Sequence, residues 1–186
     1  QRQFGKTHII TTRVEHPAVK NLCANLENLS GRKYRVTALP VDREGLLDMQ
    51  QYQDSLTDDT ALVSVMWANN ETGVLFPVEE MAVMARERGI PVVLDAGVWR
   101  EGMQPLLPLV DYLIASRAFR LPKCNNVGEM FAALHSFGVG HIAVTRGEKP
   151  VLAYEDGVIS EIPIARVRVL DSLGAGDILH GAFCHY

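Results

Sequence analysis

A nearly continuous apolar run, Ala61–Ala68 (ALVSVMWA), is the feature that most restricts the fold of this chain. Strands that are buried on both faces of a parallel sheet have this composition, because helices cover both faces. Shorter apolar or β-branched segments recur along the chain, and segments with helical spacing of apolar residues separate them. Strands that alternate with helices in this way are typical of a mostly parallel sheet between two layers of helices. The sequence therefore predicts a three-layer α/β/α fold.

The remaining elements follow from the same patterns. The expected strands are Thr7–Thr12, Tyr34–Leu39, Ala61–Ala68, Ile90–Asp95, Asp111–Ser116, His141–Thr145 and Val167–Leu170. The expected helices are Ala18–Asn28, Asp48–Leu56, Pro77–Arg88, Asn126–Phe137 and Gly176–His185. Because Asp-Gly is a favoured hairpin turn, Val151–Tyr154 and Val158–Pro163 are expected to pair antiparallel around Asp156-Gly157. The predicted class is thus α/β and Rossmann-like, with a mostly parallel sheet and an antiparallel hairpin near 151–163.

Charge and composition argue against several classes of protein. Lys plus Arg total 18 and Asp plus Glu total 22, which disfavours a nucleic-acid-binding chain. The 47% hydrophobic content is that of a globular domain, and no apolar run approaches the roughly 20 residues of a membrane span. No basic-then-apolar leader follows Gln1, so no secretion signal is expected. The cysteines are odd in number, match no metal-ligand pattern and indicate free thiols in the cytoplasm: Cys23, Cys124 and Cys184.

Four motifs in the first half carry a family resemblance. They are TTRVEHPAV at Thr11–Val19, LPVDREGLLD at Leu39–Asp48, VSVMWANNETG at Val63–Gly73 and FPVEEMA at Phe76–Ala82. Together they resemble a NifS-type cysteine desulfurase over about residues 6–95. That family has the class V aminotransferase fold and uses pyridoxal phosphate (PLP).

The resemblance implies a PLP-like set of residues. His16 matches the histidine that stacks on the cofactor ring, and Asn69 or Asn70 matches the asparagine at the phenolic oxygen. Asp95 matches the aspartate at the pyridine nitrogen, where an acid makes the ring an electron sink. Taken without the resemblance, the histidine is a turn residue, the asparagines make local backbone hydrogen bonds and the aspartate is an N-cap.

The chain departs from the desulfurase pattern at essential positions. No Ser/His-Lys segment for the Schiff-base lysine follows Asp95, and Ala96–Trp99 stands where the family has a glutamine loop. Cys23 matches no nucleophile position. Because a PLP enzyme without its lysine cannot form the internal aldimine, desulfurase activity is not expected and PLP binding is non-covalent at best.

A motif near the end of the chain, DSLGAGD at Asp171–Asp177, resembles the signature of a second family, the PfkB/ribokinase carbohydrate kinases. Its glycines let backbone N–H groups approach a phosphoryl group, and the helix that follows favours anions at its start. Three more segments fit the same family: Pro91–Met103, Val110–Phe119 and His141–Gly157. The resemblance covers about residues 86–186.

The kinase resemblance implies ATP and Mg²⁺ as cofactors and a small sugar as substrate. Asp177 matches the base that accepts the proton of the attacking hydroxyl. The residues that match the anion hole are Gly174, Ala175 and Gly176. The residues that match the lining of the ATP site are Thr145 and Gly147. Many members carry Asn-x-x-Glu where Ser116–Phe119 stands here, so the ketohexokinase-like branch is the closer comparison. Asn126 and Glu129 have that spacing later in the chain, where they are expected to start a helix, and no metal ligands are assigned.

The two resemblances meet between about residues 81 and 96. We expect a chimera: a single composite α/β domain over 1–186, with a desulfurase-like segment 1–90 and a sugar-kinase-like segment 91–186. Its best surviving site is that of an ATP-dependent carbohydrate kinase, weakly active or inactive. Two alternatives stay open, a PLP-binding fragment and a folding chimera without activity. The expected partners are a sugar and a nucleotide, not nucleic acid or membrane, and self-association through an exposed apolar patch stays open.

Overall fold

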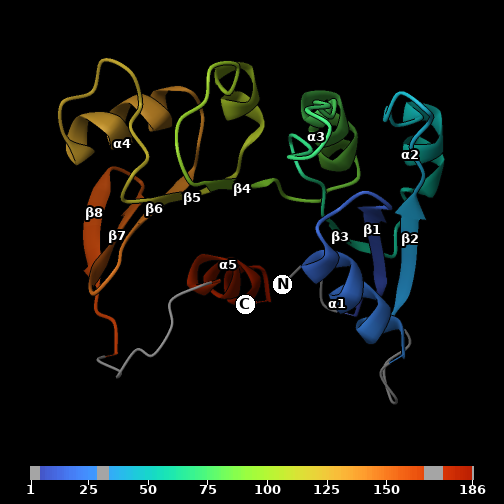
Figure 1. The fold of residues 1–186 in the computed structure, drawn as a ribbon. Helices are drawn as coiled ribbons and strands as arrows, with labels where there is room; N and C mark the ends of the chain where they lie inside the picture. Colours follow the sequence, from blue (N-terminus) through green and yellow to red (C-terminus); the bar gives the residue numbers. More distant parts are fainter. Residues whose placement is uncertain (1–4, 29–33, 166–173, 186) are drawn as a thin grey trace. The chain divides into compact units, whose positions relative to one another are not determined.

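The computed structural model describes residues 5–28, 34–165 and 174–185. The chain divides into two compact units, Gln1–Ile90 and Pro91–Tyr186, and each has a sheet of its own (Figure 1). One sheet has three strands in the order β2-β1-β3, and the other has five in the order β4-β5-β6-β7-β8. Strands β1–β3 and strands β4–β8 therefore form two separate sheets.

The N-terminal unit alternates strictly between strands and helices. In chain order its elements are β1 (His8–Thr12), α1 (Pro17–Asn28), β2 (Arg35–Leu39), α2 (Met49–Ser55), β3 (Thr60–Val63) and α3 (Val78–Glu87). Both pairings, β1 with β2 and β1 with β3, are parallel. Every element predicted for this part is present, which confirms the α/β class.

Strand β3 is much shorter than the predicted Ala61–Ala68. Its ladder with β1 ends where the Ser64 N–H donates to the Ile10 carbonyl (2.9 Å). Two residues later the Met66 N–H donates to Oε1 of Glu15 (2.6 Å) instead of to a strand. The apolar run can therefore continue beyond the sheet, because the buried Glu15 carboxyl accepts the N–H that a neighbouring strand would otherwise accept. The sequence pattern of a strand does not indicate such a partner.

A compact core and well-formed helix ends hold this unit together. Ile10, Leu39 and Tyr52 are almost fully buried, and the Tyr52 hydroxyl donates to the Met81 carbonyl (3.0 Å). Burial raises the pKa of Tyr52 to about 12. Helix α3 ends at Gly89, whose φ of 69° lets the last carbonyls bond the following N–H groups in a Schellman arrangement.

The imidazole of His8 makes this unit sensitive to acid. It is fully buried, with Nδ1 3.0 Å from Thr60 Oγ1 and Nε2 2.8 Å from Thr37 Oγ1. Burial lowers the pKa of His8 below 6.5, the Arg35 charge lowers it further, and Asp59 opposes both. Folding therefore favours the neutral ring, and stability is complete above the unfolded pKa of about 6.5 and falls as the pH drops below it.

We expect the free energy of unfolding to fall as the pH is lowered from about 7.5 to about 5.5, through the pKa of an unfolded histidine. His8→Gln keeps a donor and an acceptor beside the two threonines but does not titrate. Denaturant unfolding across this range should give a weaker pH dependence for the variant than for the wild type. Equal slopes would show that His8 does not cause the acid sensitivity.

The C-terminal unit combines parallel and antiparallel strands. Its elements are β4 (Val93–Ala96), η1 (Gln104–Leu109), β5 (Tyr112–Ser116), α4 (Val127–Ser136), β6 (His141–Arg146), β7 (Lys149–Glu155), β8 (Val158–Ile162) and α5 (Ala175–His185). Strands β4, β5 and β6 pair parallel to one another. Strand β7 pairs antiparallel with β6 on one side and with β8 on the other. Within this unit, α4 and α5 lie on opposite sides of the sheet (Figure 1).

Local sequence signals in this unit are confirmed. The predicted hairpin is present, and its two turn residues have positive φ, 48° at Asp156 and 83° at Gly157. Asn126 caps α4 by accepting from the Glu129 N–H (2.9 Å), so these two residues do start a helix. The 3₁₀ helix η1 was not predicted. The strand expected at Val167–Leu170 lies outside the described residues.

Across residues 5–28, 34–165 and 174–185, the structure has no helix that is both long and apolar enough to span a lipid bilayer.

Candidate functional site

The first candidate site lies where strand β4 ends and helix α5 begins. Asp95 is the penultimate residue of β4, and Asp177 is in the first turn of α5. The Asp177 charge contributes to raising the pKa of the Asp95 carboxyl, so the two carboxylates interact. The C-terminal unit thus brings together one residue of the predicted PLP set and one of the predicted kinase set.

The turn that precedes α5 is shaped for close approach of a ligand. Gly174 has a φ of 74°, and its carbonyl accepts the Ile178 N–H (3.0 Å), the first bond of the helix. Among the described residues of α5, the N–H groups of Ala175, Gly176 and Asp177 therefore have no acceptor. These three residues are exposed, and a Cβ built on Gly176 meets no heavy atom within 4 Å. This open turn presents backbone donors to an anion.

His180, which was not predicted as a site residue, joins the site. Its Nε2 lies 3.3 Å from Asp95 Oδ1, and its Nδ1 lies 2.7 Å from the Gly176 carbonyl. The only signal in the sequence is its spacing of three residues after Asp177, which places both on neighbouring turns of one helix. Burial raises the pKa of Asp95, His180 opposes that shift and Asp177 adds to it.

Thr145 is the penultimate residue of β6, and Gly147 directly follows this strand. Thr145 pairs in register with Ser116 of β5, and its hydroxyl donates to the Ala115 carbonyl (3.3 Å). Gly147 has a φ of 67° in the tight turn to β7. The Ser116 hydroxyl donates to the Gly97 carbonyl (2.6 Å), so the ends of β4 and β5 are tied together.

The second candidate site lies in the N-terminal unit, at the carboxyl ends of its strands. The chain leaves β1 for β2 on one side and places β3 on the other, which makes this edge a switch point. Glu15 follows β1 and is 6% exposed, and it accepts the Met66 N–H from the loop after β3. Burial raises the pKa of Glu15, and its hydrogen bonds to backbone N–H groups oppose that shift.

The predicted PLP residues of this unit are occupied by local bonds. Nδ1 of the exposed His16 accepts the Ala18 N–H (3.2 Å) at the start of α1. Oδ1 of Asn69 accepts the N–H groups of Glu71 and Thr72 (2.9 and 3.0 Å), and its Nδ2 donates to the Val14 carbonyl (3.3 Å). Asn70 is exposed. These are the turn and backbone roles that such residues play without any cofactor.

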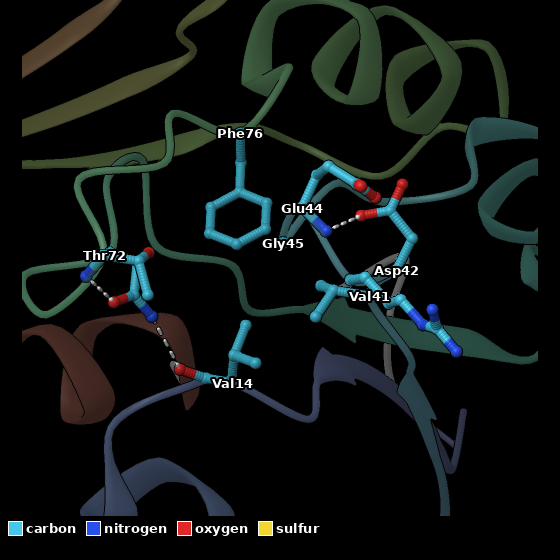
Figure 2. A pocket seen from close by; sticks show the side chains of 9 residues that line it. Val14, Val41, Asp42, Glu44, Gly45, Thr72 and Phe76 are labelled. Carbon is cyan, nitrogen blue, oxygen red and sulfur yellow. Dashed lines mark hydrogen bonds between the residues drawn. The ribbon is translucent and has the colours of Figure 1, made fainter.

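A shallow hollow of about 240 Å³ lies beside these loops. Figure 2 shows the Phe76 ring and the Val14 side chain facing it from two loops, with the Asp42–Gly45 turn along another side. Oδ1 of Asp42 accepts the N–H groups of Glu44 and Leu46 (3.0 and 2.8 Å), which fixes that turn. The volume is below the roughly 300–1,000 Å³ of typical small-molecule pockets.

The cysteines and acids give no further centre in the described part of the chain. Cys23 is buried in α1, and burial and nearby acidic residues raise the pKa of its thiol, which disfavours the reactive thiolate. No group of three or more His, Cys, Asp or Glu side chains among these residues is placed to hold a metal ion.

Comparison with known families assigns the two halves of the chain to two classes of enzyme. The model "Aminotransferase class-V" matches residues 2–99, and the model "pfkB family carbohydrate kinase" matches residues 75–185. Each match covers more than half of the 186 residues. The chain is a two-part chimera that belongs to the class V aminotransferases in its N-terminal part and to the pfkB carbohydrate kinases in its C-terminal part.

Relatives of the first part are cysteine desulfurases. NifS from Azotobacter vinelandii is 57% identical over 88 residues, which is 47% of this chain and 21% of that protein. A cysteine desulfurase from Nostoc sp. is 52% identical over 149 residues, covering 78% of this chain and 33% of that protein. The chain thus spans about a fifth to a third of the length of these relatives.

Solved structures show the kinase-type fold. The apo form of a putative Ribokinase II from E. coli matches with a TM-score of 0.63 at 15% identity, covering 98% of this chain and 70% of that one. The same protein in complex with ATP and Mg²⁺ matches with a TM-score of 0.61. At this identity the likeness establishes an α/β fold of ribokinase type and confirms the predicted fold class.

Proposed function

We propose that residues 91–186 supply the phosphoryl-transfer site of an ATP-dependent carbohydrate kinase. The observation that carries this proposal is the open turn Gly174–Asp177, which exposes backbone donors at the start of the 11-residue helix α5 beside an exposed carboxylate. An anion needs the donors, and a sugar hydroxyl needs a base close to that anion. Both features stand in one helical turn of the unit that belongs to the pfkB family.

The chemistry assigns one role to each feature of the turn. The sugar hydroxyl oxygen attacks the γ-phosphorus. The bond between the γ-phosphorus and the β–γ bridging oxygen then breaks, and ADP leaves. The Asp177 carboxylate accepts the proton of the attacking hydroxyl. The N–H groups of Ala175 and Gly176 bond the phosphoryl oxygens as negative charge shifts among them. Mg²⁺, when bound with ATP, neutralises part of the phosphate charge.

Thr145 and Gly147 are proposed to line the nucleotide side of this site. Thr145 ends the strand next to β5, and Gly147 turns the chain sharply without a side chain. The E. coli structure with ATP and Mg²⁺ supports a nucleotide in this type of fold. The acceptor is proposed to be a sugar because the family model is that of carbohydrate kinases.

Turnover is expected to be low. In the kinases that the sequence resembles, the N-terminal portion binds the sugar, and in this chain class V aminotransferase sequence stands there. Contacts to the phosphates are therefore better preserved than contacts to the sugar.

Non-covalent PLP binding by the N-terminal unit has less support. The side-chain amide of Asn69 forms hydrogen bonds with backbone groups, and His16 accepts a backbone N–H at the start of α1. Asp95, the third residue of that set, belongs to the other unit and pairs with His180. An absorbance change on mixing the chain with PLP, unaffected by lysine blocking, would favour this alternative. A cooperative melt that neither ATP nor PLP shifts would favour a chimera without activity.

The proposal is tested by ADP formation from ATP with Mg²⁺ and a panel of monosaccharides. Gly176→Val places a side chain in open space, so the fold accommodates it while the branched group obstructs the anion. We expect about a hundredfold loss of ADP formation, comparable to the loss of an oxyanion donor. Ala132→Val, at an exposed position on α4, is the matched control and should keep the wild-type rate. Equal rates for the two variants would contradict a phosphate site at this turn.

A further inference from the structure

His180 connects three elements of the C-terminal unit through one ring. Its Nδ1 lies 2.7 Å from the Gly176 carbonyl in its own helix α5. Its Nε2 lies 3.3 Å from Asp95 Oδ1 on β4 and 3.4 Å from the Ile114 carbonyl on β5. The side chain of His180 is only 16% exposed, whereas that of Asp95 is 54% exposed.

The atoms around the ring determine what it donates. The Gly176 and Ile114 carbonyls can only accept, and the Asp95 carboxylate accepts as well when ionised. The two ring nitrogens face acceptors on different elements, Nδ1 on α5 itself and Nε2 on β4 and β5. His180 therefore bridges the first turn of α5 and the carboxyl end of β4.

The Asp95 carboxyl also interacts with Asp177. The Asp177 charge raises the pKa of Asp95, and His180 opposes that shift. Both carboxylates are exposed, and the imidazole of His180 contacts the one on Asp95 (3.3 Å).

We propose that Asp95 and His180 form a positioning pair that holds the Gly174–Asp177 turn at the carboxyl ends of β4 and β5. The inference rests on the proposed function, because it states how the proposed base and backbone donors are kept in place. His180 contacts the turn at the Gly176 carbonyl, and Asp95 acts through His180, so both are positioning residues. The aspartate that the desulfurase resemblance assigns to a pyridine nitrogen thus serves the kinase turn in this chain.

The first test measures steady-state ADP formation by the full chain with saturating sugar and Mg²⁺. A base displaced by about 1 Å loses up to about a hundredfold in rate, so His180→Ala and Asp95→Asn should each lower kcat about ten- to a hundredfold. The KM for ATP should stay within about twofold. Because the two residues act as one unit, the double variant should be no slower than the slower single variant. His135→Ala, at an exposed position on α4, is the control and should keep the wild-type kcat.

The second test does not depend on activity. Hydrogen exchange of the Ile178 amide reports the bond to Gly174 that closes the turn (3.0 Å). Its protection should fall about tenfold or more in His180→Ala and in Asp95→Asn but not in His135→Ala. Unchanged protection overturns the inference at any rate of ADP formation, and so does an unchanged kcat or an additive double variant. A wild type that forms no ADP refutes the proposed function alone, and the Ile178 amide then decides the positioning role.

Discussion

Replacing Asp177 by asparagine is expected to lower Mg²⁺-dependent ADP formation about 10²- to 10⁴-fold, the range of general-base catalysis. Asparagine has nearly the same size but its amide cannot accept the proton of the sugar hydroxyl. Asp177 is exposed in the first turn of α5, so the change does not disturb a core. Melting temperature and far-UV circular dichroism should therefore stay at the wild-type values while the rate collapses.

A matched control separates the base from a general effect of charge. Asp156 is an exposed aspartate in the turn between β7 and β8 with a φ of 48°, a conformation that asparagine also adopts. Asp156→Asn removes the same charge from the same unit and should leave ADP formation unchanged. Wild-type ADP formation in Asp177→Asn would show that another group, or a contaminating kinase, causes the activity.

The second large effect is expected in the core of the C-terminal unit. Leu113, the second residue of β5, is fully buried and pairs with Leu94 on β4 and Ile142 on β6. Leu113→Ala should lower the free energy of unfolding of this unit by about 2–5 kcal/mol. Because each unit has a sheet and buried residues of its own, the N-terminal unit should keep its stability.

Two tryptophans allow the units to be followed separately. Trp67 belongs to the N-terminal unit, and Trp99 belongs to the C-terminal unit, where it contacts the Phe119 ring (centroids 6.0 Å apart). Leu113→Ala is therefore made in Trp67→Phe and Trp99→Phe backgrounds, and unfolding is followed by fluorescence. The midpoint reported by Trp99 should drop and that reported by Trp67 should not. Ile162→Ala, 51% exposed on β8, is the control with little expected effect. Equal shifts at both tryptophans would show one cooperative unit.

Sequence patterns predicted the elements whose causes are local. The Asp156-Gly157 turn and the helix start at Asn126 each depend on the conformation or hydrogen bonds of a few neighbouring residues. Apolar periodicity similarly located most strands and helices, because it reflects which face of an element is buried.

Features that depend on distant partners were beyond the sequence. The apolar run at Ala61–Ala68 leaves the sheet early because Glu15, far away in sequence, takes the Met66 N–H. The 3₁₀ helix at Gln104–Leu109 contains two prolines and lacks a helical pattern. The division into two sheets follows from which strands pair, and strand pairing is not encoded in the pattern of any single strand.

The candidate sites show the same difference between local causes and distant partners. Resemblance assigned His16 and Asn69 to a cofactor, and the structure adds that both bond nearby backbone groups. It assigned Asp95 to the same cofactor, yet the fold pairs that carboxylate with His180, more than eighty residues later. Motifs report ancestry, whereas the chemistry of a carboxylate depends on the neighbours that the tertiary fold supplies.

The central claim is that the functional site of this chain is the Gly174–Asp177 turn of its kinase-type unit. A ¹H–¹⁵N correlation spectrum of the full chain, recorded while ATP and Mg²⁺ are added, tests it most directly. We expect the largest shifts at the amides of Ala175, Gly176 and Asp177, with saturation at a defined ATP concentration. Shifts confined to the loops around His16 and Asn69, or no saturable shift in the turn, would contradict it.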